Sequence, residues 1–113
     1  MSIIITNAFS LNMLNFNADV KIRNLTAEQA KNLIEENAAH GGLHRSAIGH
    51  ADMAAVASEA LGMHIPMNRS TVELVSGDML LVAQYSGPRL PEGATTLPEG
   101  ATIKWMTVSI QQV

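Results

Sequence analysis

The chain contains no cysteine and only 7 Lys plus Arg among its 113 residues. Without cysteine, neither a disulfide framework nor a thiolate metal site is possible. The formal net charge is −3 at pH 7, whereas a general nucleic-acid binder presents a basic face. We therefore expect no duplex nucleic acid as a partner, and any polyanionic ligand should be small.

Long apolar runs are also absent. The opening residues 1–6 hold only three consecutive large aliphatic side chains, with no basic residue before them. Such a segment is neither a signal peptide nor a membrane span. The sequence thus predicts no membrane partner and a cytoplasmic location, which is the host-cell cytoplasm if the chain is viral.

The composition that remains is enough for one core. Hydrophobic residues make up 47% of the chain, and its length corresponds to a single domain over residues 1–113. A protein of this size buries a limited share of its surface, so a homodimer would help to stabilise it.

Alternation and capping signals predict the elements. Thr26 and Gln29 form a capping box that starts a helix, and Gly41-Gly42 ends it. Ser46 is expected to cap a second, alanine-rich helix that runs to about Leu61. Strands are expected at residues 2–6, 18–23, 70–76, 79–86 and 103–111, with a hairpin turn at Gly77-Asp78.

This order of elements, two strands, two helices and three strands, predicts an α+β fold. We expect a single mixed β-sheet of about five strands with its helices mainly on one face.

The start of the second predicted helix is the first candidate site. His50 lies in its first turn, and the adjacent Gly49 lets a ligand approach the backbone closely. A helix N-terminus offers free N–H groups to an anion, and imidazole can move a proton near neutral pH. Ser46, Gly49 and His50 are therefore expected to contact substrate. The alternative is a surface histidine in a capped helix.

A second candidate site follows a predicted strand. Arg89 comes after Gly87-Pro88 in a turn, and arginine can hold a phosphate with two parallel hydrogen bonds. Glu92, three residues on, can orient a hydroxyl or the arginine itself. The alternative is a solvated turn with a weak ion pair.

The same loop contains a duplication. Leu-Pro-Glu-Gly-Ala-Thr occurs at residues 90–95 and again at 97–102. We interpret it as a local duplication without a structural role, which makes Glu99 a possible decoy for Glu92.

Two further groups of polar residues are weaker candidates. Asn7, Ser10 and Asn12 can hydrogen-bond ribose or base edges, or only cap the local backbone. Asn68-Arg69, after Pro66, is a second candidate for an anion contact, and residues of this kind are more often plain surface.

A metal site is not expected. His40 and His44 are four apart, but the two glycines between them make a shared helix face unfavourable, and no carboxylate pair completes a tetrahedral set. The sequence predicts neither metal nor another cofactor.

Four blocks of the chain resemble the small viral and bacterial ring nucleases that act as type III anti-CRISPR proteins. They cover the chain from about residue 2 to about residue 111, in family order. The blocks are Asn-Ala-Phe-Ser-x-Asn-Met at 7–13, Ser-Ala-Ile-Gly-His at 46–50, Asn-Arg at 68–69 and Gln-x-x-x-x-Arg-Leu-x-Glu-Gly at 84–93.

The resemblance implies a homodimer that binds cyclic tetra-adenylate across its twofold axis. The ring is cut to linear di-adenylates ending in 2′,3′-cyclic phosphate, which silences type III CRISPR signalling. The resemblance makes His50 the general acid and Arg89 and Glu92 active-site residues. It implies ligand contacts at Asn7, Ser10, Asn12, Arg69 and Gln84.

Two other functions stay open. One is a module that binds or sequesters the cyclic oligonucleotide without cutting it, and the other is a small structural dimer with no ligand. His50 distinguishes the nuclease from the binder, because a pure binder has little use for a titratable group at the scissile bond.

Overall fold

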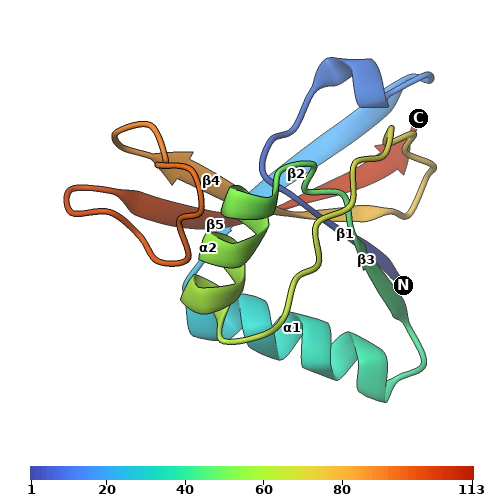
Figure 1. Ribbon diagram of the computed structural model, residues 1–113. Coiled ribbons are helices and arrows are strands. Elements are labelled where there is room, and N and C mark those ends of the chain that lie inside the picture. Colours follow the sequence, from blue (N-terminus) through green and yellow to red (C-terminus); the bar gives the residue numbers. More distant parts are fainter.

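A computed structural model describes all 113 residues, 1–113, and contains one mixed five-stranded sheet with two helices. The strand order across the sheet is β2-β5-β4-β1-β3. Figure 1 shows both helices beside the sheet and the loop between β4 and β5, in orange, projecting next to α2. The elements are β1 (Ser2–Thr6), a 3-10 turn η1 (Leu11–Met13), β2 (Ala18–Leu25), α1 (Ala27–Ala39), β3 (Leu43–Ser46), α2 (Ala51–Leu61), β4 (Met79–Ser86) and β5 (Thr102–Gln112).

The strand directions make the sheet mixed. β1 pairs in parallel with both β3 and β4, while β5 is antiparallel to both β4 and β2. The α+β class with one mixed five-stranded sheet is therefore confirmed. A single chain is described, so the predicted homodimer stays a prediction.

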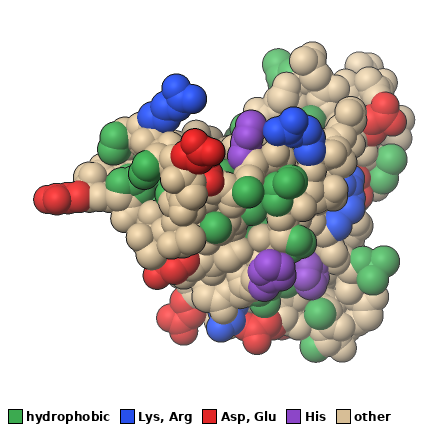
Figure 2. Space-filling model, viewed as in Figure 1, with side chains coloured by type: hydrophobic (Ala, Val, Ile, Leu, Met, Phe, Trp, Pro, Cys, Tyr) green, Lys and Arg blue, Asp and Glu red, His purple; other side chains and the backbone are tan.

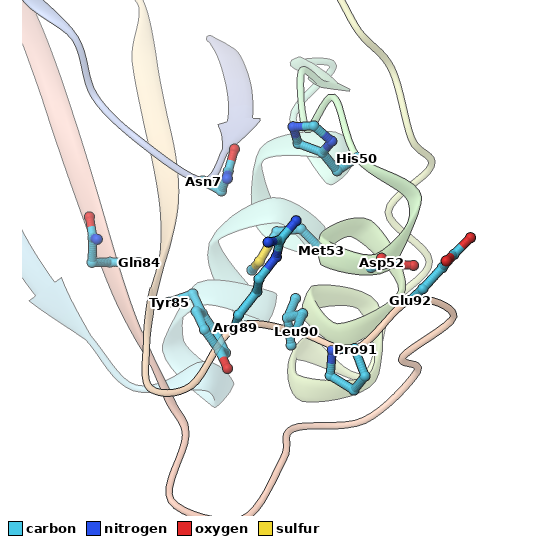
Figure 3. Close-up of a pocket in the computed structure, with 10 residues that line it drawn as sticks. All are labelled: Asn7, His50, Asp52, Met53, Gln84, Tyr85, Arg89, Leu90, Pro91 and Glu92. Atoms are coloured by element: carbon cyan, nitrogen blue, oxygen red, sulfur yellow. The ribbon is translucent and has the colours of Figure 1, made fainter.

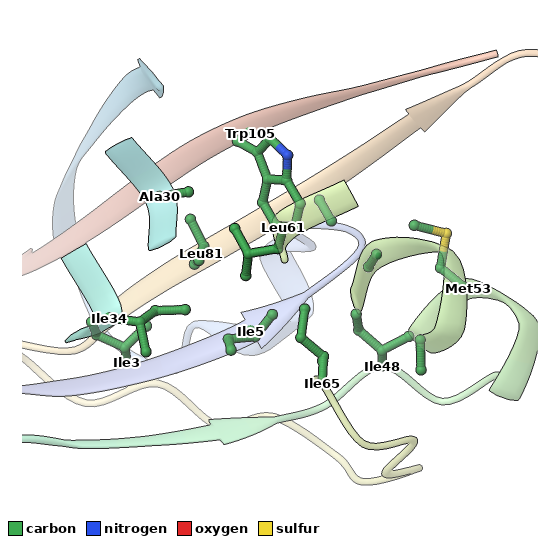
Figure 4. Packing of buried hydrophobic residues seen from close by; sticks show 13 residues of the cluster. Ile3, Ile5, Ala30, Ile34, Ile48, Met53, Leu61, Ile65, Leu81 and Trp105 are labelled. Carbon is green, nitrogen blue, oxygen red and sulfur yellow. The ribbon is translucent and has the colours of Figure 1, made fainter. Parts of the chain in front are cut away.

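Alternate residues of each central strand face opposite sides of the sheet, as the pleat requires. On β1, Ile3 and Ile5 pack in the cluster beneath the helices, whereas Ile4 packs on the other face. Figure 4 shows the helix-side cluster, where Ile34 of α1 lies beside Ile3 of β1 and Trp105 of β5 belongs to the same cluster. The opposite face is covered by the η1 loop and the chain around Val72 and Leu74.

The first helix begins as predicted. Thr26 Oγ1 accepts from the Gln29 backbone N–H at 3.1 Å, and Gln29 Oε1 accepts from the Thr26 N–H at 2.9 Å. This reciprocal pair satisfies two of the N–H groups that a helix start leaves without partners. At its far end α2 stops at Gly62, whose φ of 74° is the left-handed conformation that glycine adopts without strain.

The predicted helix start at Ser46 is wrong. Residues 43–46 form the edge strand β3, and α2 begins only at Ala51. The Ser46 side chain is buried, and its Oγ accepts from the Ile48 N–H at 3.2 Å. The hydroxyl thus holds a turn between strand and helix instead of capping the helix.

The predicted strand at 70–76 is also wrong, and with it the hairpin around Gly77-Asp78. The alternation there is real, because Val72 and Leu74 are buried while their neighbours are exposed. However, β4 already has β1 on one edge and β5 on the other, so no edge is left for another strand. Leu74 instead donates one backbone hydrogen bond to the Met13 carbonyl, at 2.9 Å.

Neither helix is long and apolar enough to cross a lipid bilayer.

Candidate functional site

The start of α2 is held rigidly by the core behind it. Ile48 is fully buried, and its carbonyl accepts from the Asn68 backbone N–H at 2.8 Å. Asn68 Nδ2 also donates to the Ser46 carbonyl at 2.7 Å. These contacts fix the chain two residues before His50, so the imidazole projects from an anchored segment.

His50 itself is the residue that precedes the first turn of α2. Its backbone is extended, with φ −127° and ψ 132°, and no side chain caps the helix there. The first N–H groups of a helix have no partners within it, and a side-chain cap normally satisfies one of them. An exposed imidazole therefore stands beside uncapped N–H donors.

The loop between β4 and β5 is closed at its base by a glycine. Gly87 has φ 144°, and a Cβ built on it would lie 2.7 Å from the Cα of Ala101. Only glycine allows the two arms of the loop to approach so closely. The Tyr85 hydroxyl donates to the Pro88 carbonyl, and Leu90 packs against the helix-side core. Arg89 lies between these two anchors.

Beyond Leu90 the chain makes a tight turn that contacts α2. Ala94 N–H donates to the Pro91 carbonyl at 3.1 Å, and Gly93 has φ 82°. The Gly93 N–H donates to Asp52 Oδ1 at 3.0 Å, which ties the turn to the first turn of the helix. Glu92 is thereby brought to the same side of the molecule as His50.

These elements surround an open pocket of about 940 Å³. Figure 2 shows a hollow between the projecting loop and the body, with acidic and basic side chains interspersed around it. In Figure 3, Arg89 and His50 point toward the same space, while Glu92 points away from Arg89. The pocket is lined by Asn7, His50, Asp52, Met53, Gln84, Tyr85, Arg89, Leu90, Pro91 and Glu92.

The whole chain was compared with known proteins. Residues 3–106 match the family model described as STIV B116-like. The chain belongs to the STIV B116-like family. Among solved structures it is similar to B116 of Sulfolobus turreted icosahedral virus, with 28% identity, a TM-score of 0.80, and coverage of 96% of this chain and 99% of that chain. No curated protein matches it.

The family takes its name from a viral protein, so the resemblance to viral proteins is confirmed at that level. In this B116-like chain, the three predicted catalytic residues His50, Arg89 and Glu92 all line one pocket. Asn7 and Gln84, two of the expected ligand contacts, line it as well. They come from three stretches of the chain that are far apart in the sequence, at residue 7, residue 50 and residues 84–92.

The other expected ligand contacts lie outside the lining of this pocket. Ser10 Oγ accepts from the Asn12 N–H at 3.3 Å, which caps η1 locally. Arg69 Nε donates to the Gly49 carbonyl at 3.3 Å, so the arginine side chain lies beside that glycine. Ser46 is buried in its turn, as described above.

Sequence reasoning missed Asp52, which lines the pocket and holds the loop. An acidic residue in the first turn of a helix is favourable in any protein, because it complements the helix dipole. It therefore gave no signal of a site. Met53, Tyr85, Leu90 and Pro91 were missed because their contact with the pocket depends on how the loop folds.

The lining groups carry little positive charge. With the imidazole uncharged, Arg89 contributes +1 and Asp52 and Glu92 contribute −1 each, a sum of −1. No cluster of three or more His, Asp or Glu side chains is placed to hold a metal ion. Independence of metal and cofactor stays a prediction.

Proposed function

We propose that this chain is a metal-independent ring nuclease that acts on cyclic tetra-adenylate. It binds the ring at a homodimer interface and cuts it to linear di-adenylates with 2′,3′-cyclic phosphate, which switches off type III CRISPR signalling in the cytoplasm of the host cell. One observation carries the proposal: His50 and the distant Arg89 and Glu92 meet at one pocket.

The reaction needs little from the protein beyond alignment and charge. The nucleophile is the ribose 2′-oxygen, which bonds to phosphorus while the P–O5′ bond breaks in line with it. His50, as imidazolium, gives its proton to the leaving O5′, and the 2′-hydroxyl proton passes to water. The products are a 2′,3′-cyclic phosphate and a 5′-hydroxyl, so no metal-bound water is required.

Charge on the phosphorane is stabilised from two sides. The Arg89 guanidinium offers paired donors, and the uncapped N–H groups at the start of α2 offer fixed dipoles next to His50. Asn7 and Gln84 supply amide groups of the kind that read base edges and ribose hydroxyls.

Glu92 needs one movement to take part. Its exposed carboxylate points away from Arg89 in Figure 3. Exposed side chains change rotamer in picoseconds to nanoseconds, so ligand binding can turn the carboxylate inward. There it would orient the ribose or the Arg89 guanidinium.

The number of phosphate-binding groups per chain favours a dimer as the active unit. Each pocket offers one Arg89 side chain and one helix start to a ring with four phosphates, whereas two pockets offer two of each. A cyclic ligand with rotational symmetry matches an interface with a twofold axis. We expect one ring to bind per two chains, measured by calorimetry on His50→Ala so that turnover does not interfere.

The decisive experiment combines labelled cyclic tetra-adenylate with the protein in excess EDTA and resolves the products. Di-adenylates with 2′,3′-cyclic ends are expected. His50→Ala should lower the single-turnover rate by roughly 10²–10⁴, the range for losing a general acid, with a much smaller change in binding. Activity that EDTA abolishes and Mg²⁺ restores, or a His50→Ala variant within a few-fold of wild type, would overturn the mechanism.

The second candidate is a module that sequesters the ring without cutting it. The outward direction of the Glu92 carboxylate favours it, because an aligned catalytic group is not required for binding. Tight binding of an intact ring by the wild-type protein would identify this function. A thermal-shift screen in which no cyclic oligoadenylate raises the Tm would instead indicate a structural dimer without this ligand.

A further inference from the structure

The duplicated hexapeptide makes the same turn twice, but only the first copy donates a backbone hydrogen bond to a side chain of α2. In the first, Ala94 N–H donates to the Pro91 carbonyl, and in the second Ala101 N–H donates to the Pro98 carbonyl, both at 3.1 Å. Gly93 and Gly100 both have φ 82°. Yet the Gly93 N–H donates to Asp52 Oδ1, and no such acceptor lies at Gly100.

Because the two turns are the same in sequence and backbone, the turn itself does not explain why the first copy is held on the helix. The difference lies in the partner. Asp52 comes two residues after His50, and Gly93 directly follows Glu92. One hydrogen bond therefore joins the segment that carries the proposed acid to the segment that carries Arg89 and Glu92.

We infer that Asp52 is a positioning residue that docks the Pro91–Ala94 turn on α2 and so keeps Arg89 and Glu92 at the pocket. Its effect on catalysis rests on the proposed function, whereas the docking itself does not. The loop is also held at its base, at Gly87 and Pro88, and at Leu90. Past Leu90 the Asp52 carboxylate is the side chain that ties the turn to the helix.

The charge of Asp52 points to the same role. A carboxylate in the lining of a phosphate pocket repels the ligand, so it works against binding unless it does something else. Accepting the Gly93 N–H gives the carboxylate a donor of its own and places it between helix and loop. The carboxylate thus holds the Pro91–Ala94 turn on α2, which explains why an acidic residue is present in this pocket.

The two copies supply their own control for a test by amide hydrogen exchange. Gly93 and Gly100 each stand between Glu and Ala, so their intrinsic exchange rates are matched. In the free wild-type protein, Gly93 should exchange about tenfold more slowly than Gly100, the protection that one such hydrogen bond gives. In Asp52→Ala the two rates should become equal, and in Asp52→Asn, which keeps an acceptor oxygen, most of the difference should remain.

Turnover of cyclic tetra-adenylate is the second measurement. Asp52→Ala should lower kcat about tenfold without raising KM, because the same change removes the repulsion between the carboxylate and the phosphates. Asp52→Asn should recover most of kcat. Asp78→Ala is the matched control, because Asp78 also accepts a backbone N–H, from Val75 at 2.9 Å, but lies away from the pocket. It should leave kcat unchanged.

The outcomes separate the two proposals. Equal exchange at Gly93 and Gly100 in the wild-type protein overturns the docking, whatever the enzyme does. Slow Gly93 exchange that Asp52→Ala abolishes supports the docking even if the wild-type protein cuts no ring, a result that rejects only the proposed function. If the wild-type protein cuts the ring and Asp52→Ala cuts it equally fast, Asp52 does not position the catalytic groups.

Discussion

The two copies of Leu-Pro-Glu-Gly-Ala-Thr differ in what surrounds them and not in how they fold. Each makes a turn closed by a 3.1 Å hydrogen bond with glycine at φ 82°. The first copy places Glu92 at the pocket and Gly93 on Asp52, while the second places Ala101 against Gly87 at the base of the loop. The local sequence thus determines the conformation of each turn, whereas residues distant in the sequence determine which contacts the turn makes.

The largest effect is expected from removing one copy of the hexapeptide, which tests whether both copies are required. Deleting residues 90–96 leaves Arg89 followed by a single Leu-Pro-Glu-Gly-Ala-Thr. That copy cannot close the loop base and also reach α2, because Glu92 and Ala101 are nine residues apart. We expect ring cleavage to fall by roughly 10² or more, as losses of aligned catalytic groups do, with the sheet intact by circular dichroism. Full activity would show that one copy is sufficient, in agreement with the interpretation of the duplication as having no structural role.

A smaller change compares the two copies through one alanine substitution in each. Glu92→Ala should lower kcat by roughly 10-fold to 10²-fold, because the carboxylate orients groups at the reacting phosphate. Glu99→Ala, the matched control in the other turn, should stay within twofold, because Glu99 does not line the pocket. Single-turnover rates of both variants give the answer. The reverse order of effects would assign the function to the second copy.

Much of the fold was predictable because its signals are local. The capping box at Thr26, the alternation from residue 18 and the glycine after Leu61 each report on a few neighbouring residues. The structure confirms the helix start, the strand and the helix end that they predict. The apolar side chains Val20 and Ile22 of β2 are nevertheless exposed. The strand β3 was missed because Leu-His-Arg-Ser is short, and its first three side chains are exposed at the sheet edge. The strand predicted at 70–76 failed because both edges of β4, with which it would form the hairpin, are already paired with β1 and β5.

The site was predictable only in part, because sequence signals are local and the site depends on contacts between distant segments. His50 and Arg89 were identified because polar residues at the ends of helices and strands are common in functional sites. Whether Arg69 or Asp52 lines the same pocket as His50 and Arg89 depends on contacts between distant segments. One such contact is the hydrogen bond between Asp52 and Gly93, which are 41 positions apart. No spacing in the sequence encodes that contact, so Asp52 was missed, and the ligand contact expected at Arg69 stays a prediction.

The loop base gives the next prediction. Gly87→Ala would place a Cβ 2.7 Å from the Ala101 Cα at φ 144°, so both collision and backbone strain oppose it. We expect the free energy of unfolding to fall by about 2–3 kcal/mol, measured by urea denaturation. Gly77→Ala has a strained φ of 91° but meets no atom within 4 Å, and it should cost about half as much. Equal losses would mean that Ala101 does not close the loop.

The smallest expected effect tests whether a side chain at the glycine position destabilises the two turns equally. Gly93→Ala and Gly100→Ala both put a side chain at φ 82° with nothing within 4 Å, so each should lower the free energy of unfolding by about 1 kcal/mol. Both variants keep the backbone N–H, and urea denaturation should give the same loss within about 0.5 kcal/mol. Because exposed loops can relax part of the strain, the difference between the variants is more informative than either value. A larger loss at position 93 than at 100 would mean that the hydrogen bond to Asp52 resists relaxation of the first turn. A larger loss at 100 would contradict this expectation, since it would assign the more constrained turn to the copy that has no hydrogen bond to Asp52.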